Sequence, residues 1–164
     1  MCVCTLTDMC ACTQWDTLLR MSTPAERTWE SVLRIHAHVL PRLERTVLRS
    51  TGLPLAWYDV LLELKLAGGR LTMSELGNRV VLSRTRVSRL VDELSSAGLV
   101  GKEANPNDGR SSFATLTPAG MKRFREAAKV YLPAIEQELG GVDRATLERL
   151  ADDLGRLWRS VSDA

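Results

Sequence analysis

The stretch that decides the fold is SRTRVSRLVDEL, which occupies residues 83–94. At 100° per residue, its four large apolar side chains fall on one face of a helix. They are Val87, Leu90, Val91 and Leu94. Ser83 suits the N-cap position, and Gly98 is a typical stop signal just beyond the end. The sequence therefore predicts an amphipathic helix from Ser83 to about Ala97, with its arginines ahead of its acids.

Two helices are predicted immediately upstream of this one. The first runs from Leu55 to Ala67 and ends at the pair Gly68-Gly69. Its inward side chains are expected to be Trp57, Val60, Leu61 and Leu64. The second is short, because Thr72-Met-Ser-Glu75 matches a capping box and residues 80–83 look like a tight turn. Its apolar face is Met73, Leu76 and Val80.

A β-hairpin is predicted downstream. Residues 99–104 and 113–117 flank the segment Asn-Pro-Asn-Asp-Gly at 105–109, which is a dense turn signal. Three helices followed by a hairpin make a helix-turn-helix with a β wing. We therefore expect a winged helix-turn-helix over residues 54–117.

The outer segments carry long apolar seams. Thr23 and Pro24 suit the start of a helix that reaches about Arg49, with Pro41 expected to kink or divide it. Its seam is Trp29, Leu33, His36, Leu40, Leu43 and Val47. A helix capped by Thr117-Pro118 follows the wing, with Pro133 expected to kink it. Its seam is Met121, Phe124, Ala128, Tyr131, Ile135 and Leu139.

A last helix follows Gly140-Gly141, with its apolar residues again spaced by threes and fours. They are Leu147, Leu150, Leu154, Leu157 and Val161. These seams exceed what one small domain can cover, so we expect them to pair across a two-fold axis. The predicted fold class is mainly α with a small β wing (α+β), with dimerisation helices at 23–53 and 118–164 around the winged helix-turn-helix.

The chemistry predicted for this arrangement is DNA binding. Arginine can bond guanine bidentately in the major groove, and short hydroxyl side chains reach bases or phosphates. The candidate residues on the predicted recognition helix are Ser83, Arg84, Thr85, Arg86, Ser88 and Arg89. At the hairpin tip, Arg110 can enter a narrow minor groove and Asp108 can orient it. The alternative for the helix is an ordinary solvated face, and for the tip a plain turn with incidental charges.

These motifs resemble the MarR family of bacterial transcriptional regulators. The resemblance lies in the stretch from Leu82 to Val100, in Asp108-Gly-Arg110 and in Leu116-Thr-Pro-Ala-Gly120, and it extends over about residues 24–160. It implies a winged-helix homodimer that binds a pseudo-palindromic operator, usually as a repressor. Gly101-Lys102 departs from the basic pair that many members carry after the recognition helix.

The resemblance also implies a small aromatic or phenolic effector, bound between the dimer helices and the winged helix. Candidate residues near such a cleft are Arg34, His36, His38, Trp57 and Tyr58. For His36 the alternative is a hydrogen-bonded residue of a core or interface, because it falls on the apolar seam. An effector would favour a dimer geometry that no longer matches the two half-sites.

All four cysteines lie in residues 1–22, at Cys2, Cys4, Cys10 and Cys12. We interpret this segment as a disordered extension, which a start codon assigned too far upstream would explain because Met21 begins an ordinary N-terminus. The alternative is a thiol- or metal-responsive regulator, since four thiolates can hold zinc. C-x-C spacing is tighter than the usual zinc knuckle, and no metal site or cofactor is predicted.

Composition supports a globular, non-membrane protein. The 164 residues are 45% hydrophobic and 26% charged, with a net charge of +2. We expect neither a membrane span nor a signal peptide, and therefore a cytoplasmic location. An enzyme is not expected, because the sequence has no glycine-rich phosphate loop and no organised catalytic set. A winged-helix protein-interaction module without DNA binding remains the third class, against which the arginines at 84, 86, 89 and 110 argue.

Overall fold

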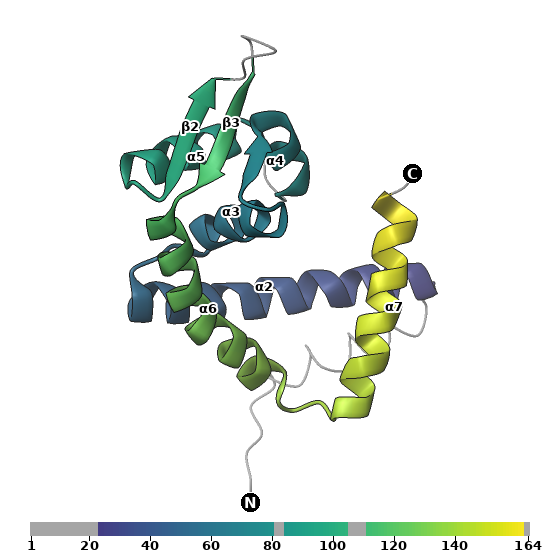
Figure 1. Ribbon diagram of the computed structural model, residues 1–164. Helices are drawn as coiled ribbons and strands as arrows, with labels where there is room; N and C mark the ends of the chain where they lie inside the picture. The colour runs from purple at the N-terminus through teal and green to yellow at the C-terminus, as the bar shows by residue number, and fades with distance from the viewer. Residues whose placement is uncertain (1–22, 81–83, 105–110, 163–164) are drawn as a thin grey trace, which may run out of the picture. The chain divides into compact units, whose positions relative to one another are not determined.

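The computed structural model describes residues 23–80, 84–104 and 111–162, and the chain divides into two units, Met1–Arg42 and Leu43–Ala164. The described part is mainly helical with one small sheet (Figure 1). In chain order its elements are α2 (Pro24–Thr51), α3 (Leu55–Leu66), β1 (Arg70–Thr72), α4 (Met73–Arg79), α5 (Arg84–Ser96), β2 (Val100–Ala104), β3 (Ser112–Leu116), α6 (Pro118–Leu139) and α7 (Arg144–Ser162).

Threonine caps begin three of these helices, as the sequence predicts. The Thr72 hydroxyl accepts from the Glu75 N–H at 3.1 Å, and the Glu75 carboxylate accepts from the Thr72 N–H at 2.8 Å. The same reciprocal pair begins α2, between Thr23 and Glu26. Thr117 caps α6 by accepting from the Gly120 N–H. Each cap satisfies backbone donors that the first helical turn leaves without partners.

The sheet has three antiparallel strands in the order β1-β3-β2. The predicted hairpin is confirmed: β2 pairs with β3, with Gly101 opposite Thr115 and Glu103 opposite Phe113. The strand β1 is not expected from the sequence. It pairs its three residues with β3, placing Leu71 opposite Ala114. Its shortness is the reason, since three residues are too few for an alternating pattern.

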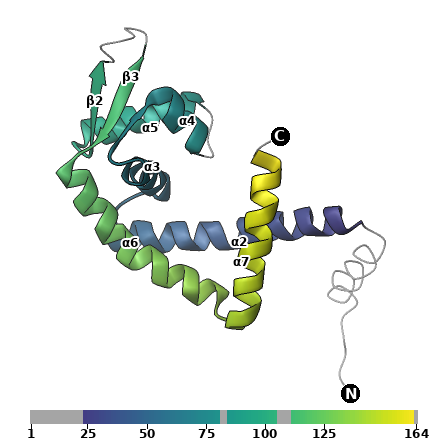
Figure 2. The ribbon, with the colours of Figure 1, turned by 45° about the vertical axis from the view of Figure 1, so that its right-hand side comes forward.

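The winged helix has a continuous apolar core, in which α3, α4 and α5 pack with the inner face of the sheet (Figure 2). The predicted inward face of α5 is buried throughout, at Val87, Leu90, Val91 and Leu94. From α3 come Leu55, Tyr58, Val60, Leu61 and Leu64. The strands and α4 contribute the buried side chains of Leu71, Leu76, Val100 and Ala114 to this core. The predicted winged helix-turn-helix is therefore confirmed.

Two local expectations are refined. Of the two outcomes expected at Pro41, division of the helix does not occur, because α2 continues past the proline, as α6 does past Pro133. One lost backbone hydrogen bond is a small fraction of the total in helices of 28 and 22 residues. Trp57 does not face fully inward: it is half-buried, and the adjacent Tyr58 occupies the core position instead.

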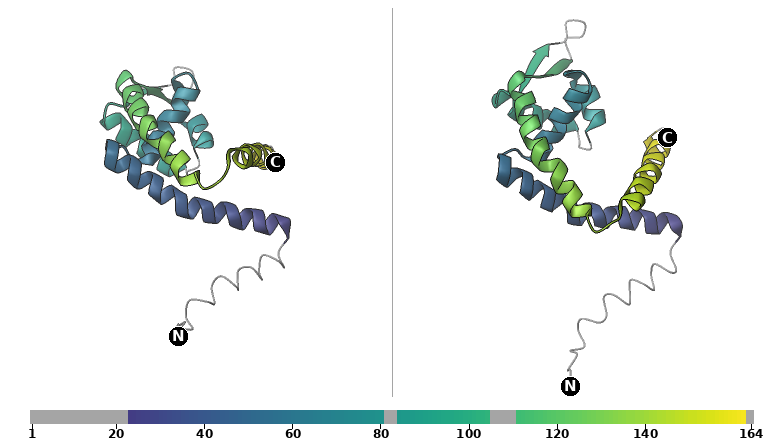
Figure 3. Two further views of the ribbon diagram at one scale, coloured as in Figure 1. Left: turned by 90° about the horizontal axis from the view of Figure 1, so that it is seen from below. Right: turned by 60° about the horizontal axis from the view of Figure 1, so that its bottom comes forward.

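The helix α6 leaves the sheet directly after β3, and the views of Figure 3 follow it from that point. Phe124 and Ala127 on its first half are buried. Arg123 donates to the Thr51 carbonyl oxygen at 2.7 Å, which satisfies an acceptor at the C-terminal end of α2. The first half of α6 is therefore part of the same packed unit as the winged helix.

The helix α7 differs, because none of its residues is buried. Its apolar side chains nevertheless fall on one face, as the sequence predicts, and several of them are exposed. The exposed ones are Leu150, Leu154, Leu157, Trp158 and Val161. Among the described residues, no helix combines the length and apolarity that crossing a membrane requires.

Candidate nucleic-acid interface

The outer face of α5 carries the predicted DNA-binding side chains. Arg86, Ser88 and Arg89 are exposed; by helical spacing Arg89 lies opposite the buried apolar face, and Arg86 and Ser88 lie on its flanks. Arg84 and Thr85 belong to the same helix, but their side chains are not among those described, and Ser83 lies outside the described residues. The described part of the helix thus presents two arginines and a serine to solvent.

Neither arginine is neutralised within the described part of the chain. No ion pair joins Arg86 or Arg89 to another described residue, although α5 also carries Asp92 and Glu93. Both acids are bound elsewhere. Asp92 pairs with the Lys102 ammonium group of β2 at 2.6 Å. Glu93 accepts a hydrogen bond from the indole N–H of Trp57 on α3, with 3.1 Å between Nε1 and Oε2.

These two contacts also attach the recognition helix to its surroundings. Trp57 links it to α3 and Lys102 links it to the wing strand β2. Lys102 follows Val100 by two residues on β2, which places both on the inner face of the sheet. That alternation was available in the sequence, whereas the contact between Trp57 and Glu93 spans 36 positions and leaves no local signal.

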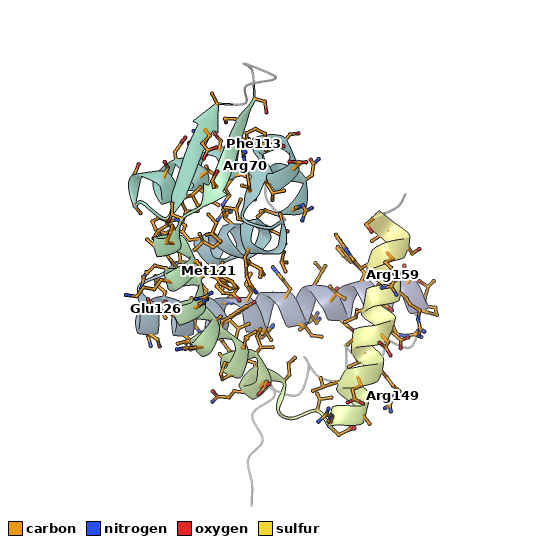
Figure 4. All side chains as sticks on the ribbon, viewed as in Figure 1. Arg70, Phe113, Met121, Glu126, Arg149 and Arg159 are labelled. Carbon is orange, nitrogen blue, oxygen red and sulfur yellow. The ribbon has the colours of Figure 1, made fainter. Side chains whose placement is uncertain are left out.

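The outer face of the sheet is braced by a second group of contacts. The guanidinium of Arg70 on β1 stacks over the Phe113 ring of β3, 3.8 Å from its centroid (Figure 4). The same guanidinium pairs with Glu103 of β2 at 3.2 Å. One side chain thus touches both other strands, and cation–π contacts of this kind stabilise modestly at exposed sites. Sequence reasoning missed Arg70 because the strand that carries it was not predicted.

The junction between wing and α6 explains the Leu116-Thr-Pro-Ala-Gly120 motif physically. The Thr117 hydroxyl lies 2.9 Å from the Gly98 carbonyl oxygen and 3.0 Å from that of Leu99. At Gly120 the backbone of α6 approaches Leu99 so closely that a Cβ would overlap the Leu99 carbonyl oxygen. Gly98 itself has φ +72°, which suits glycine at a helix end. The motif thus fixes where the recognition helix ends and α6 begins.

The candidate effector residues fall in both units. Tyr58 is 3% exposed and lies between two aromatic rings, with centroids 5.0 Å from Phe124 and 4.9 Å from Tyr131. Burial raises the pKa of both tyrosines. In the other unit, Arg34 pairs with Glu30 at 2.7 Å, and the His38 Nδ1 lies 2.9 Å from the Arg34 carbonyl oxygen. His36 is exposed within that unit.

Several predicted residues lie outside the described part. Asp108 and Arg110 of the wing tip belong to the undescribed segment 105–110, and all four cysteines belong to 1–22. In the ranges 23–80, 84–104 and 111–162, no group of His, Cys, Asp or Glu side chains is arranged to hold a metal ion.

Comparison with known proteins agrees with this geometry. Residues 51–111 match the model of the MarR family. The repressor IacR of Pseudomonas putida is 23% identical over 117 residues, which are 71% of this chain and 69% of IacR.

Solved structures extend the likeness beyond the matched segment. Sco3205, a MarR family regulator of Streptomyces coelicolor in complex with DNA, superimposes with a TM-score of 0.74 at 26% identity. The match covers 85% of this chain and 93% of Sco3205. The organohalide-sensing regulator RdhR-CbdbA1625, in a form bound to 2,4-dichlorophenol, shares the fold with a TM-score of 0.70 at 20% identity, over 87% of this chain and 83% of that one. With the arginine face of α5, the three-stranded wing and the junction at Gly120, these likenesses identify residues 51–111 as a MarR family domain, in a chain that shares the fold of MarR family DNA-binding transcriptional regulators.

Proposed function

We propose that the protein is a homodimeric repressor that reads its operator through Arg86 and Arg89 of α5, together with Ser88. The observation that carries this proposal is the exposed arginine face, whose neighbouring acids are bound to other elements. On the sequence pattern, Ser83, Arg84 and Thr85 extend this surface, and Arg110 with Asp108 adds a minor-groove contact. DNA as the target makes the cytoplasm the site of action.

The direct test is alanine substitution at the two arginines. A duplex selected by the protein from a randomised pool serves as operator, with a scrambled duplex beside it. Arg86→Ala and Arg89→Ala should weaken operator binding by about 1–3 kcal/mol for each lost base contact. A pure phosphate contact should instead weaken both duplexes alike and flatten the salt slope. Unchanged operator affinity in both variants would contradict the assignment.

A matched control is available on α6. Arg125 is exposed, and substitution to alanine removes the same charge. We expect Arg125→Ala to bind both duplexes nearly as the parent does, since its position is not on the recognition helix. A loss as large as that of Arg89→Ala would mean that net charge, and not the α5 surface, sets the affinity.

The dimer is proposed from the apolar face of α7. Leu150, Leu154 and Leu157 are 44–47% exposed, and Trp158 is 64% exposed. Arg149 and Arg159, labelled in Figure 4, lie on the opposite side by helical spacing. A helix with one apolar face and no buried residue gains stability by packing against a second copy.

Sedimentation tests this part separately. Leu154→Asp should convert dimer to monomer at micromolar concentration, because association would bury an unpaired carboxylate. Asp153, next to it, is exposed and already acidic, so Asp153→Asn is a matched control that should leave the dimer intact. A parent protein that sediments only as monomer would overturn the proposed dimer without touching the recognition helix.

The proposed signal is a small aromatic or phenolic effector that releases DNA. Its support is the likeness to a regulator solved with 2,4-dichlorophenol, whereas the likeness to the repressor IacR supports repression as the sign of regulation. Titration of phenols and aromatic carboxylates against the protein–operator complex tests it. A true effector must bind the two dimer geometries with different affinity, so it should both release DNA and raise the melting temperature of the free protein. If no compound does either, this class of effector is wrong.

A further inference from the structure

The recognition helix places two carboxylates within reach of Arg89. Asp92 follows it by three residues and Glu93 by four, and these are the spacings at which side chains on a helix form ion pairs. Either pair would neutralise the guanidinium that the proposed function assigns to DNA. Within the described residues, neither pair forms.

The Glu93 carboxylate is held instead by Trp57. The indole N–H donates to Glu93 Oε2 at 3.1 Å, and indole can act only as a donor. Trp57 is half-buried on α3, between the buried residues Leu55 and Tyr58. The donor is therefore fixed by a packed helix, whereas Glu93 lies on the exposed surface of α5.

Asp92 is held less firmly. Its ion pair with Lys102 is exposed at both ends, with 58% of the Asp92 side chain and 37% of the Lys102 side chain in contact with solvent. Exposed ion pairs contribute little and are screened by salt. Lys102 could also contact a phosphate itself, so its substitution would not separate the two roles. Trp57 offers the cleaner test.

Resting on the proposed role of Arg89 in DNA binding, we propose that Trp57 is a positioning residue: its indole N–H keeps the Glu93 carboxylate away from Arg89. Without that hydrogen bond, Glu93 is free to pair with Arg89 in the unbound protein. Operator binding must then break the pair between Arg89 and Glu93. Binding also brings the released Glu93 carboxylate close to the DNA phosphates. Trp57 thus acts on DNA affinity without touching DNA.

The experiment uses the full chain, the selected operator duplex and four variants: Trp57→Phe, Glu93→Gln, the double variant of these two, and Trp57→Phe combined with Glu136→Gln. Phenylalanine keeps an aromatic ring and removes the donor. In Glu93→Gln the amide oxygen still accepts from the indole, so this variant should bind at least as tightly as the parent. Glu136 is an exposed acid on α6, so its substitution matches the change in net charge.

We expect Trp57→Phe to weaken operator binding about two- to fivefold at low salt, because each of the two protomers would have to break one helical ion pair. The ratio between variant and parent should fall toward one as salt rises, because the competing pair is exposed. In the Glu93→Gln background, Trp57→Phe should have almost no effect. In the Glu136→Gln background the full loss should remain.

Rescue by Glu93→Gln distinguishes this role from a structural one. A packing defect at Trp57 would lower the melting temperature and weaken binding whatever residue stands at position 93, and its effect would not depend on salt. A loss without rescue, or no loss at all, overturns the inference. If Arg89→Ala binds the operator as the parent does, the proposed function is wrong at Arg89 and the inference falls with it.

Discussion

The winged helix and α7 bury their apolar side chains to very different extents. In α3 and α5 the apolar faces are covered by the other elements of the same chain, so that Leu61, Val91 and Leu94 have no exposed surface. In α7 the apolar face is as regular, but Trp158 is 64% exposed and no residue is buried. The first region completes its core from its own residues, and the second does not.

This difference shows that an amphipathic pattern indicates that one face of a helix must be buried. The pattern does not indicate which chain supplies the atoms that cover that face. Burial of a large apolar side chain stabilises by about 1.5–3 kcal/mol, wherever the covering atoms come from. In α5 the covering atoms belong to α3, α4 and β2. For α7 we propose that they belong to a second copy of the chain. Three predictions sharpen the contrast.

The largest effect is expected for a core truncation. Leu61→Ala should lower the free energy of unfolding by about 2–5 kcal/mol, because it removes buried atoms and leaves a cavity. The matched change on α7, Leu150→Ala, should cost much less at low protein concentration and more as concentration rises. Chemical denaturation at two concentrations separates them. A similar, concentration-independent cost for both would mean that α7 is covered within its own chain.

A cap inside the winged helix should have an intermediate effect. Thr72→Ala removes the hydroxyl that caps α4, and such a loss costs about 1 kcal/mol of protein stability. The hydrogen bonds from the Thr72 backbone and hydroxyl also hold the pKa of Glu75 below its usual range. Thr72→Ser keeps the hydroxyl and is the control, so it should unfold at nearly the parent's denaturant midpoint. Equal midpoints for the serine and alanine variants would argue against the cap.

The smallest effect concerns pH. Desolvation by neighbouring groups, with the like charge of Glu63, raises the pKa of Asp59 to about 6. Asp59 is nevertheless an exposed residue of α3, so solvent screening reduces its effect on stability below that of the cap. The folded protein therefore holds this proton more tightly than the unfolded chain, whose aspartates titrate near 3.9. Its contribution to stability is present below about pH 4 and is lost as pH rises through about 6.

Substitution isolates that contribution from other carboxyl groups. The difference in unfolding free energy between Asp59→Asn and the parent should grow between pH 4 and pH 7, in favour of the variant. Denaturant titrations at several pH values measure it. A difference that stays constant over this range would show that Asp59 titrates alike in the folded and unfolded states.

The sequence predicts the features whose causes are local. The caps at Thr23, Thr72 and Thr117 depend on residues three positions apart, and the apolar face of α5 depends on helical periodicity alone. The hairpin is predictable because one turn signal, at residues 105–109, separates two short strand-like segments. The exposed arginines of the recognition helix are predictable for the same reason, because helical periodicity puts them outside the apolar face.

Other features depend on contacts between distant segments and leave no local pattern. The strand β1 exists because β3 supplies its backbone partners, and Arg70 is placed over Phe113 by that pairing. The half-buried position of Trp57 depends on how α3 packs. Its hydrogen bond to Glu93 joins two residues that are 36 positions apart in the sequence. The charge state of the arginine face is therefore a tertiary property, although the arginines themselves are evident in the sequence.

The position of Trp57 also has a spectroscopic consequence. Trp29 and Trp158 are 63% and 64% exposed, whereas Trp57 is half-buried and donates to a carboxylate. In a Trp15→Phe, Trp29→Phe, Trp158→Phe background, the remaining indole emission comes from Trp57 alone. A dissolved quencher such as iodide should reach it poorly while the Glu93 contact is intact. The protein thus carries an intrinsic optical probe at the joint between α3 and its recognition helix, which allows motion at that joint to be followed without a label.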